Sequence, residues 1–330
     1  MTLPQLPDPH TPLDQQTAHE IFAAILDGAF DEDRLVAFLT AMAERDETGA
    51  EIAGAALAMR ERMIPIRAPA GAIDVCGTGG DGAHSLNVST AVAIVVAAAG
   101  VPVAKHGNRA ASSKAGAADT LEALGLDLDR ASERAEGSLA EIGLCFLFAQ
   151  KHHPALKPLG PIRKRIGRRT IFNLLGPIAN PAGVTRQLIG VARPDFLPVY
   201  AAAIERIGCD AAMLVSGDEP LDELSIGGPS SLFRLGSIGW GPERFEPETA
   251  GLSRHPLTAI RGGDAAFNAA ALRRLLAGEA GAYRDAVLLN AAAALIVAGK
   301  SSNWRDAIFV AEEAINSGAA RSLLARWIAY

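Results

Sequence analysis

Residues 73–90, IDVCGTGGDGAHSLNVST, place a short apolar run before a loop of glycines, an acid, hydroxyls and an amide. Four glycines within residues 77–82 would let the backbone approach an anion without Cβ clashes. After the loop we expect a helix capped by Ser89 or Thr90, whose unpaired N–H groups favour negative charge. The pattern indicates a phosphate site, although a tight strand–helix turn without a ligand is the alternative. It matches neither a nucleoside-triphosphate P-loop nor a GxGxxG dinucleotide loop.

A second polar segment, AKHGNRAASSK at residues 104–114, follows the next apolar run. It is rich in side chains that bind anions or form hydrogen bonds: Lys105, His106, Asn108, Arg109, Ser112, Ser113 and Lys114. Because the carboxyl ends of parallel strands meet at one edge of a sheet, we expect both segments to lie at the same edge. The sequence therefore predicts a ligand site there, with an anion as the ligand.

The segment SGDEPLDELSIGG at residues 216–228 contains two pairs of adjacent acids, Asp218 with Glu219 and Asp222 with Glu223. Mg²⁺ prefers hard oxygen ligands and keeps several waters, so one or two carboxylates and substrate phosphates suffice to bind it. Spacing alone does not choose between the pairs, and either could consist of ordinary loop acids.

The elements that position these segments follow from apolar periodicity. Residues 14–63 repeat apolar positions every three or four residues, which predicts three or four helices. Beyond a linker at 64–71, short apolar runs alternate with helical stretches, and the chain is Ala-rich and helical again from 264. We expect an α/β protein with a small all-helical N-terminal domain, residues 1–68.

Helices from about 163–184 are expected to join this helical domain. Residues 69–330 are expected to form a larger α/β domain with a central, mainly parallel sheet flanked by helices. Within it, the runs AIDVCG, VPVAKHG and CFLFA and residues 187–192 and 210–216 are the expected strands.

Composition excludes several function classes. The chain has 330 residues, of which 49% are hydrophobic, and a net charge of −6, which argues against general affinity for nucleic acid or anionic membranes. The most apolar stretches are too short to cross a bilayer. Three cysteines lie far apart without a CxxC pattern, and no secretory leader pattern is seen. We therefore expect a cytoplasmic protein with no nucleic-acid or membrane partner.

Several motifs in order along the chain closely resemble the anthranilate phosphoribosyltransferase family. They are GTGGDG, NVST, KHGNR, SSK-G-AAD, residues 146–181 with RTIFNLLGP, LDELS, and the tail RGGDAAFNAAALRRLLAG. The resemblance implies transfer of phosphoribose from phosphoribosyl pyrophosphate (PRPP) to the amine of anthranilate, with release of pyrophosphate, in tryptophan biosynthesis. It also implies Mg²⁺ and a homodimer formed through the helical domain.

The resemblance assigns roles to individual residues. It implies that PRPP is bound by Gly77, Thr78, Gly79, Gly80, Asp81, Asn87, Ser89, Thr90, Lys105 and Ala117. It implies that anthranilate is bound by Gly77, His106, Asn108, His153, Arg163 and Gly176. For the metal, LDELS selects Asp222 and Glu223, with the Ser89 hydroxyl close by. Because an aromatic amine is neutral at pH 7, we expect no obligatory general base, and His106 is the candidate for an assisting role.

Three positions depart from the family pattern. Ala115 and Ala117 stand where serine is common, and His152 stands where tyrosine is common. Each missing hydroxyl is expected to weaken PRPP binding by about 1 kcal/mol. None of the changes removes a charge, so we expect activity to be retained.

Three other functions are compatible with parts of the pattern. A pyrimidine nucleoside phosphorylase should carry a different lysine loop and lack RTIFNLLGP. A catalytically silent, nucleic-acid-binding relative should have a disrupted glycine loop or acidic pair. The helices of residues 14–63 could instead recruit a partner, such as the amidotransferase half of anthranilate synthase.

Overall fold

The predicted strands form one sheet in the computed structural model, which describes residues 5–110, 114–219 and 221–330. Within these residues the sheet has seven strands: β1 (Ile73–Gly77), β2 (Val103–Gly107), β3 (Leu144–Phe148), β4 (Arg186–Gly190), β5 (Ala211–Gly217), β6 (Ser230–Gly236) and β7 (Gly241–Phe245). Their order is β3-β2-β1-β4-β5-β6-β7. The five strands from β3 to β5 in this order are parallel, so the expected mainly parallel sheet is confirmed.

The antiparallel strands β6 and β7 are not predicted by the sequence patterns. β5 pairs antiparallel with β6, and β6 with β7. The last strand, GPERF, alternates between exposed and partly buried residues and ends on the buried Phe245. An edge strand of this kind has few apolar positions, so its sequence resembles a loop.

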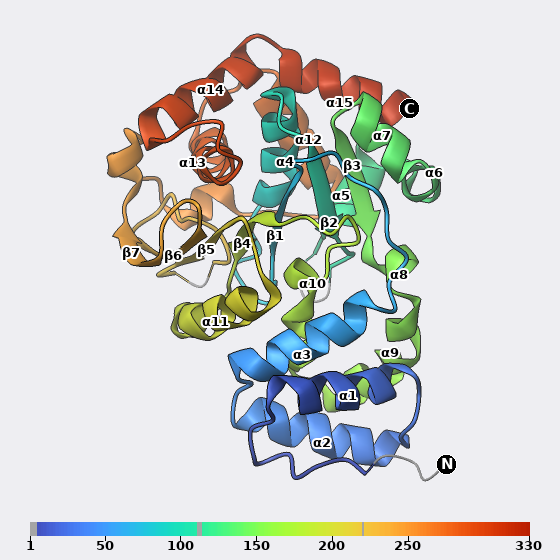
Figure 1. The fold of residues 1–330 in the computed structure, drawn as a ribbon. Helices are drawn as coiled ribbons and strands as arrows, with labels where there is room; N and C mark the ends of the chain where they lie inside the picture. Colours follow the sequence, from blue (N-terminus) through green and yellow to red (C-terminus); the bar gives the residue numbers. More distant parts are fainter. Residues whose placement is uncertain (1–4, 111–113, 220) are drawn as a thin grey trace.

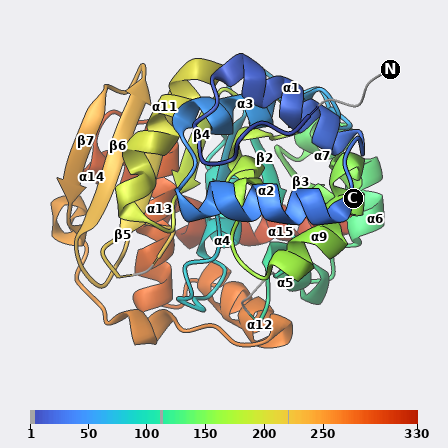
Figure 2. The same cartoon turned by 90° about the horizontal axis from the view of Figure 1, so that it is seen from below.

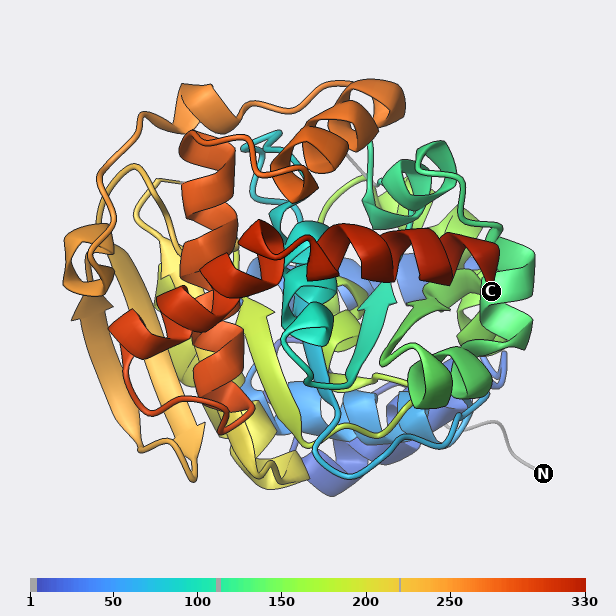
Figure 3. The same ribbon diagram turned by 90° about the horizontal axis from the view of Figure 1, so that it is seen from above.

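Helices cover both faces of the sheet (Figures 1 and 3). The layer drawn above the sheet in Figure 1 contains α4 (Val88–Ala98), α12 (Ala265–Leu276), α13 (Ala282–Val297), α14 (Trp304–Asn316) and α15 (Ala319–Ala329). Beside β3 lie α5 (Ala117–Ala123), α6 (Leu128–Glu133) and α7 (Ala135–Glu141). On the opposite face lie α1 (Gln15–Leu26), α2 (Glu32–Glu44), α3 (Gly49–Arg60), α8 (Ala149–His152), α9 (Gly160–Ile166), α10 (Leu175–Ile178) and α11 (Leu197–Ile207).

Two large apolar cores follow from this layering. Along β5, Met213 belongs to the core shared with α4 and α13, whereas its neighbour Leu214 belongs to the core shared with α3 and α11. Successive side chains of a strand point to opposite faces, so a sheet that is covered on both sides reads as a continuous apolar run. This explains why the parallel strands were recognisable as short apolar runs.

Capping side chains start the first three helices, whose ribbons Figure 2 shows from below. Asp14 accepts a hydrogen bond from the Thr17 N–H, and Asp31 accepts one from the Arg34 N–H. Thr48 and Glu51 form a capping box at α3. The predicted helices within residues 14–63 are confirmed. Apolar residues of α9 and α10 pack in the same core as these helices. The boundary at residue 68 and the homodimer stay predictions.

No helix in the described part of the chain is both long enough and apolar enough to cross a membrane.

The buried Glu47, between α2 and α3, should make the stability of the fold depend on pH. It is 7% exposed, and burial raises its pKa from the ordinary 4.5 to about 6, although the charge of Arg169 opposes the shift. A raised pKa means that this group stabilises the fold below about pH 4.5 and that the contribution is lost as the pH rises through 6. The free energy of unfolding of Glu47→Gln minus that of wild type should therefore increase by roughly 2 kcal/mol between pH 4.5 and pH 7.5.

Urea unfolding at a series of pH values measures this difference. Glu44→Gln is the control, because Glu44 forms an exposed ion pair with Arg168 and such pairs contribute little. A difference between Glu47→Gln and wild type that stays constant over this pH range would contradict the prediction.

Candidate active site

The strand order places a topological switch point beside β1. The chain runs from β1 to β2 and β3 on one side, and β4 then pairs with the other side of β1. In open α/β sheets the ligand site lies outside the carboxyl ends of the strands at such a point. A cavity of about 340 Å³ lies there, lined by the loop after β1, the end of β2, residues of α9 and α10, and the acidic segment after β5.

Most of the residues expected to bind substrates line this one cavity. They are Gly77, Thr78, Gly79, Gly80, Asp81, Asn87, Ser89, Lys105, His106, Asn108, Ala117, Arg163, Gly176, Asp222 and Glu223. Thr90 and His153 are buried and are not among the lining residues. His153 packs beside His106, with ring centroids 5.1 Å apart. The cavity thus unites the segments that the sequence places at one sheet edge, while the role of each residue stays a prediction.

The three departures from the family pattern differ in their positions. Ala115 and Ala117 line the cavity, whereas His152 does not. Instead, His152 is buried, and its Nδ1 lies 2.9 Å from the Ile64 carbonyl oxygen. Ser112 and Ser113 of the second polar segment lie outside the described residues.

The glycine loop adopts a backbone that favours glycine. Gly79, Gly80 and Gly82 have φ angles of +66°, +79° and +76°, and no atom lies within 4 Å of a Cβ built on any of them. L-residues rarely adopt such angles, so the loop needs glycine for its conformation as well as for close approach of a ligand. The Gly79 N–H donates to Asp222 Oδ2 at 2.7 Å, which ties the loop to the acidic segment.

Gly77 is needed for a different reason than the other loop glycines, because it leaves space for a neighbouring residue. It ends β1 opposite Gly190, which ends β4. A Cβ on Gly77 would collide with the Asp222 carboxylate, and one on Gly190 would collide with the Asp222 backbone. Both glycines therefore make room for Asp222. No sequence motif points to Gly190, and the one signal for it is a glycine at the end of an expected strand.

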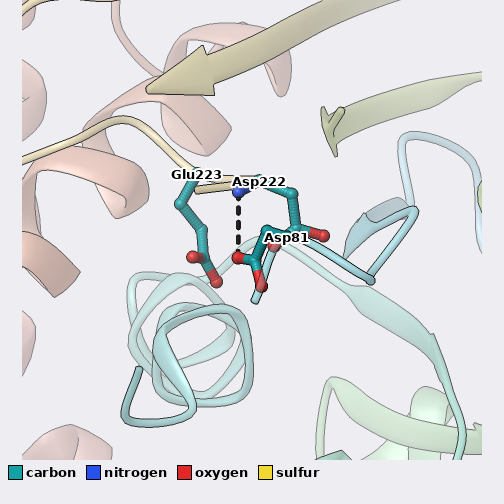
Figure 4. A group of neighbouring side chains, drawn as sticks. All are labelled: Asp81, Asp222 and Glu223. Carbon is teal, nitrogen blue, oxygen red and sulfur yellow. Dashed lines mark hydrogen bonds between the residues drawn. The ribbon is translucent and has the colours of Figure 1, made fainter. Parts of the chain in front are cut away.

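Three carboxylates meet between the glycine loop and the acidic segment (Figure 4). Ligand oxygens of Asp81, Asp222 and Glu223 all lie within 4.8 Å of one another. The Asp222 N–H donates to Asp81 Oδ2 at 3.2 Å, the bond drawn in Figure 4. Asp81 is expected from the sequence to contact PRPP, and its position beside both other acids was not predicted.

The electrostatics of this cluster fit a divalent cation. Burial, followed by the charge of Asp81, raises the pKa of Asp222 to about 7. Burial and the Asp222 charge raise the pKa of Glu223 well above its ordinary value. Glu223 Oε2 is buried and has no hydrogen-bond partner among the described residues. Clustered hard oxygen ligands that repel one another, one of them without a described hydrogen-bond partner, suit Mg²⁺.

The other acidic pair, Asp218 and Glu219, forms its contacts outside the cavity. Asp218 forms an ion pair with Arg244, with both contacts at 2.5 Å. Glu219 accepts a hydrogen bond from the Ser225 hydroxyl at 2.6 Å. Neither acid lines the cavity. The geometry therefore favours Asp222 and Glu223, as the resemblance implies.

Lys105 is the buried cation of the site. It is 2% exposed, and its Nζ donates to the Val75 carbonyl oxygen at 2.7 Å and to Ser89 Oγ at 3.2 Å. Burial lowers the pKa of Lys105, while the charges of Asp74, Glu223 and Asp222 oppose that shift. A strand residue therefore holds an ammonium group among the acids beneath the glycine loop.

His106 has a defined tautomer. Its Nδ1 lies 2.8 Å from the Gly176 carbonyl oxygen, which only accepts, so Nδ1 carries the proton. The other nitrogen, Nε2, is then an acceptor; it is buried and lacks a partner in the described part of the chain. Burial lowers the pKa of His106, and burial lowers that of His153 to about 3, so both rings are neutral at pH 7.

Arg163 is a cation that lines the cavity. It is partly buried, burial lowers its pKa, and it has no side-chain hydrogen bond or ion pair with a described residue. The neighbouring Arg165 and Arg168 are exposed and pair with Asp33 and Glu44. Those two cations therefore lie on a solvated face, whereas Arg163 faces the cavity and is available to an acidic ligand.

Two expectations about the polar segments need correction. Helix α4 begins at Val88 with Asn87 as its N-cap, and not with Ser89 or Thr90. The Asn87 side chain does not cap the helix, because its oxygen accepts hydrogen bonds from other side chains. Arg109 lines the cavity but pairs with Asp119 and Glu122, so its charge is already compensated.

The fold and the site define a glycosyltransferase. Residues 70–321 match the model of the glycosyl transferase family, a/b domain, and residues 9–63 match that of its helical bundle domain.

Individual relatives show which family of glycosyltransferases the chain belongs to. The chain is 61% identical over 329 residues to the anthranilate phosphoribosyltransferase of Novosphingobium aromaticivorans, covering 100% of this chain and 99% of the relative. The crystal structure of the Thermus thermophilus enzyme has a TM-score of 0.92 and 43% identity, covering 97% and 96% of the two chains. A Saccharomyces cerevisiae structure in complex with PRPP and Mg has a TM-score of 0.87 and 29% identity, covering 96% and 93%. The chain belongs to the anthranilate phosphoribosyltransferase family.

Proposed function

We propose that this chain transfers the phosphoribosyl group of PRPP to the amine of anthranilate, giving N-(5′-phosphoribosyl)anthranilate and pyrophosphate in tryptophan biosynthesis. One observation carries the proposal: a single cavity is lined by the glycine loop, the buried Lys105, three clustered carboxylates and the unpaired Arg163. These groups suit a diphosphate, its counter-cation and a second, carboxylate-bearing substrate. The free cysteines agree with a cytoplasmic location.

The donor side of the cavity is formed by the glycine loop, the start of α4 and Lys105. Backbone N–H groups of the loop and the side chains of Asn87, Ser89 and Thr90 would bind phosphate oxygens. Lys105 supplies positive charge. Asp222 and Glu223, with Asp81 beside them, would hold Mg²⁺, which when bound stabilises the negative charge of the leaving pyrophosphate. The yeast relative in complex with PRPP and Mg supports this assignment.

The acceptor side is formed by Arg163, His106, Asn108 and Gly176, with His153 behind His106. A guanidinium can bind the anthranilate carboxylate through two parallel hydrogen bonds. The amine lone pair then forms the new bond to the ribose carbon as the bond to pyrophosphate breaks, and the electron pair leaves with pyrophosphate. The neutral amine needs no strong base, and the unprotonated Nε2 of His106 would accept the proton that the amine loses if it assists the reaction.

The direct test mixes the purified chain with Mg²⁺, PRPP and anthranilate and follows the loss of anthranilate fluorescence. The proposal expects a loss that requires both PRPP and Mg²⁺. A parallel assay with a pyrimidine nucleoside and phosphate tests the phosphorylase alternative. Unchanged fluorescence together with phosphorolysis would overturn the proposal.

Arg163→Ala should raise the KM for anthranilate by about thirtyfold, because a charge-assisted hydrogen bond contributes roughly 2 kcal/mol. The KM for PRPP should change by less than about twofold, since the lost contact is to the other substrate. Arg165→Ala is the matched control, because Arg165 lies on the same helix but pairs with Asp33 at the surface. A defect in the KM for PRPP instead would place Arg163 on the wrong side of the cavity.

A further inference from the structure

Two buried residues donate hydrogen bonds to the side-chain amide oxygen of Asn87. Asn87 lines the cavity just before α4. Its Oδ1 accepts hydrogen bonds from the Thr120 hydroxyl at 2.5 Å and from Asn268 Nδ2 at 2.9 Å. Thr120, in α5, is 0% exposed, and Asn268, in α12, is 2% exposed. Two helices that are far apart in the sequence thus converge on one amide oxygen.

The direction of these hydrogen bonds is set by the backbone. The Gly263 N–H donates to Asn268 Oδ1 at 2.8 Å. Because a backbone N–H cannot accept, Asn268 must present its oxygen to Gly263 and its Nδ2 to Asn87. Asn87 in turn must present its oxygen to Asn268, so its NH₂ group faces the other way. On that side, Asn87 Nδ2 makes one hydrogen bond to a described residue, a long one of 3.4 Å to the Ala115 carbonyl oxygen.

The main chain around Asn87 is fixed by the same C-terminal region. The Leu86 N–H donates to the Ile260 carbonyl oxygen at 2.8 Å, and the Gly262 N–H donates to the His84 carbonyl oxygen at 2.8 Å. The Tyr283 hydroxyl donates to the Asn87 carbonyl oxygen at 3.1 Å. Both the position and the amide orientation of Asn87 are therefore imposed by residues that do not line the cavity.

We propose that Thr120 and Asn268 are positioning residues for the donor substrate: they hold the Asn87 NH₂ group as a donor toward the phosphate oxygens of PRPP. Ionised phosphate oxygens only accept hydrogen bonds, so a reversed amide would present an oxygen to an anion and repel it. This inference rests on the proposed function, in which Asn87 contacts PRPP. It gives a function to the hydrogen bonds by which the buried Thr120 and Asn268 link α5 and α12 to Asn87 at the edge of the cavity.

Thr120→Val tests the inference, because valine keeps the shape of threonine and removes the hydroxyl donor. The KM for PRPP should rise by about tenfold, the effect of misdirecting one hydrogen bond to a charged group. The KM for anthranilate and kcat should change by less than about twofold. Thr120→Ser keeps the hydroxyl and should restore the KM for PRPP to within about twofold of wild type. Equal values for the two variants, or a parallel rise in both KM values, would overturn the inference.

Asn268→Asp is the second variant, in case Thr120→Val folds poorly. Aspartate still accepts from Gly263 but cannot donate to Asn87, so the KM for PRPP should again rise, by at least about tenfold. An unchanged KM for PRPP in this variant would contradict the inference.

Asn87→Ala separates this inference from the proposed function. It should raise the KM for PRPP, and adding Thr120→Val to it should cause no further rise, because the two side chains act as one unit. No effect of Asn87→Ala on this KM would overturn the donor role of Asn87 in the proposed function. An effect of Asn87→Ala with none from Thr120→Val or Asn268→Asp would overturn the positioning inference alone.

Discussion

Replacement of Asp222 by Asn together with Glu223 by Gln should lower kcat by about a thousandfold at an Mg²⁺ concentration that saturates wild type. The two carboxylates and Asp81 form the cluster that suits a divalent cation, and amides bind such a cation much more weakly. Without it, the negative charge that develops on pyrophosphate loses several kcal/mol of stabilisation. Initial rates measured over an Mg²⁺ titration check both the loss of rate and the higher metal requirement.

Asp218→Asn is the matched control for this experiment. Asp218 lies in the same acidic segment, but it pairs with the exposed Arg244 and does not line the cavity. Its rate and Mg²⁺ requirement should stay close to those of wild type. Normal turnover by the Asp222 and Glu223 double variant, or an equal defect in Asp218→Asn, would show that the metal site has been assigned to the wrong acids.

Gly190→Ala should lower kcat/KM by about a hundredfold, although it removes no functional group. The added Cβ would collide with the backbone of Asp222 and push that residue away from Gly79, to which it now bonds at 2.7 Å. A displacement of about 1 Å at a reacting centre costs roughly this factor. Steady-state kinetics with both substrates, combined with thermal unfolding to confirm a folded chain, measures the effect.

Gly228→Ala is the control for steric effects in this region. Nothing lies within 4 Å of a Cβ built at Gly228, at the end of the same acidic segment. This variant should retain activity close to that of wild type. If Gly190→Ala were also fully active, Asp222 would not need the space that the two strand-end glycines leave.

The sequence predicted the main features of the site because they depend on short-range patterns and on parallel topology. The strands β1 and β2 begin with apolar residues, and polar side chains such as Asp81 and Asn108 follow their ends. Parallel strands deliver such residues to one edge of the sheet, and the cavity lies at that edge. The choice of Asp222 and Glu223 over the neighbouring pair needed the family pattern, since spacing did not distinguish them.

Other features depend on three-dimensional register, which local patterns do not contain. The need for Gly190 follows from its pairing with Gly77 across β1 and β4. Asp81 joins the acidic pair only because the glycine loop folds against residues that lie 141 positions further along the chain. Helix α4 starts at Val88, and Asn87 does not cap it because Thr120 and Asn268 bind its side chain. Such long-range contacts override a local capping preference.

We expect the glycine loop, Lys105 and the acidic segment to bind PRPP and its metal together. A crystal structure of the chain grown with PRPP and Mn²⁺, with anomalous diffraction to locate the manganese, tests it most directly. The expected result is an anomalous peak at Asp222 and Glu223, with the diphosphate over residues 77–82. Manganese and diphosphate bound at another place on the molecule would contradict the claim.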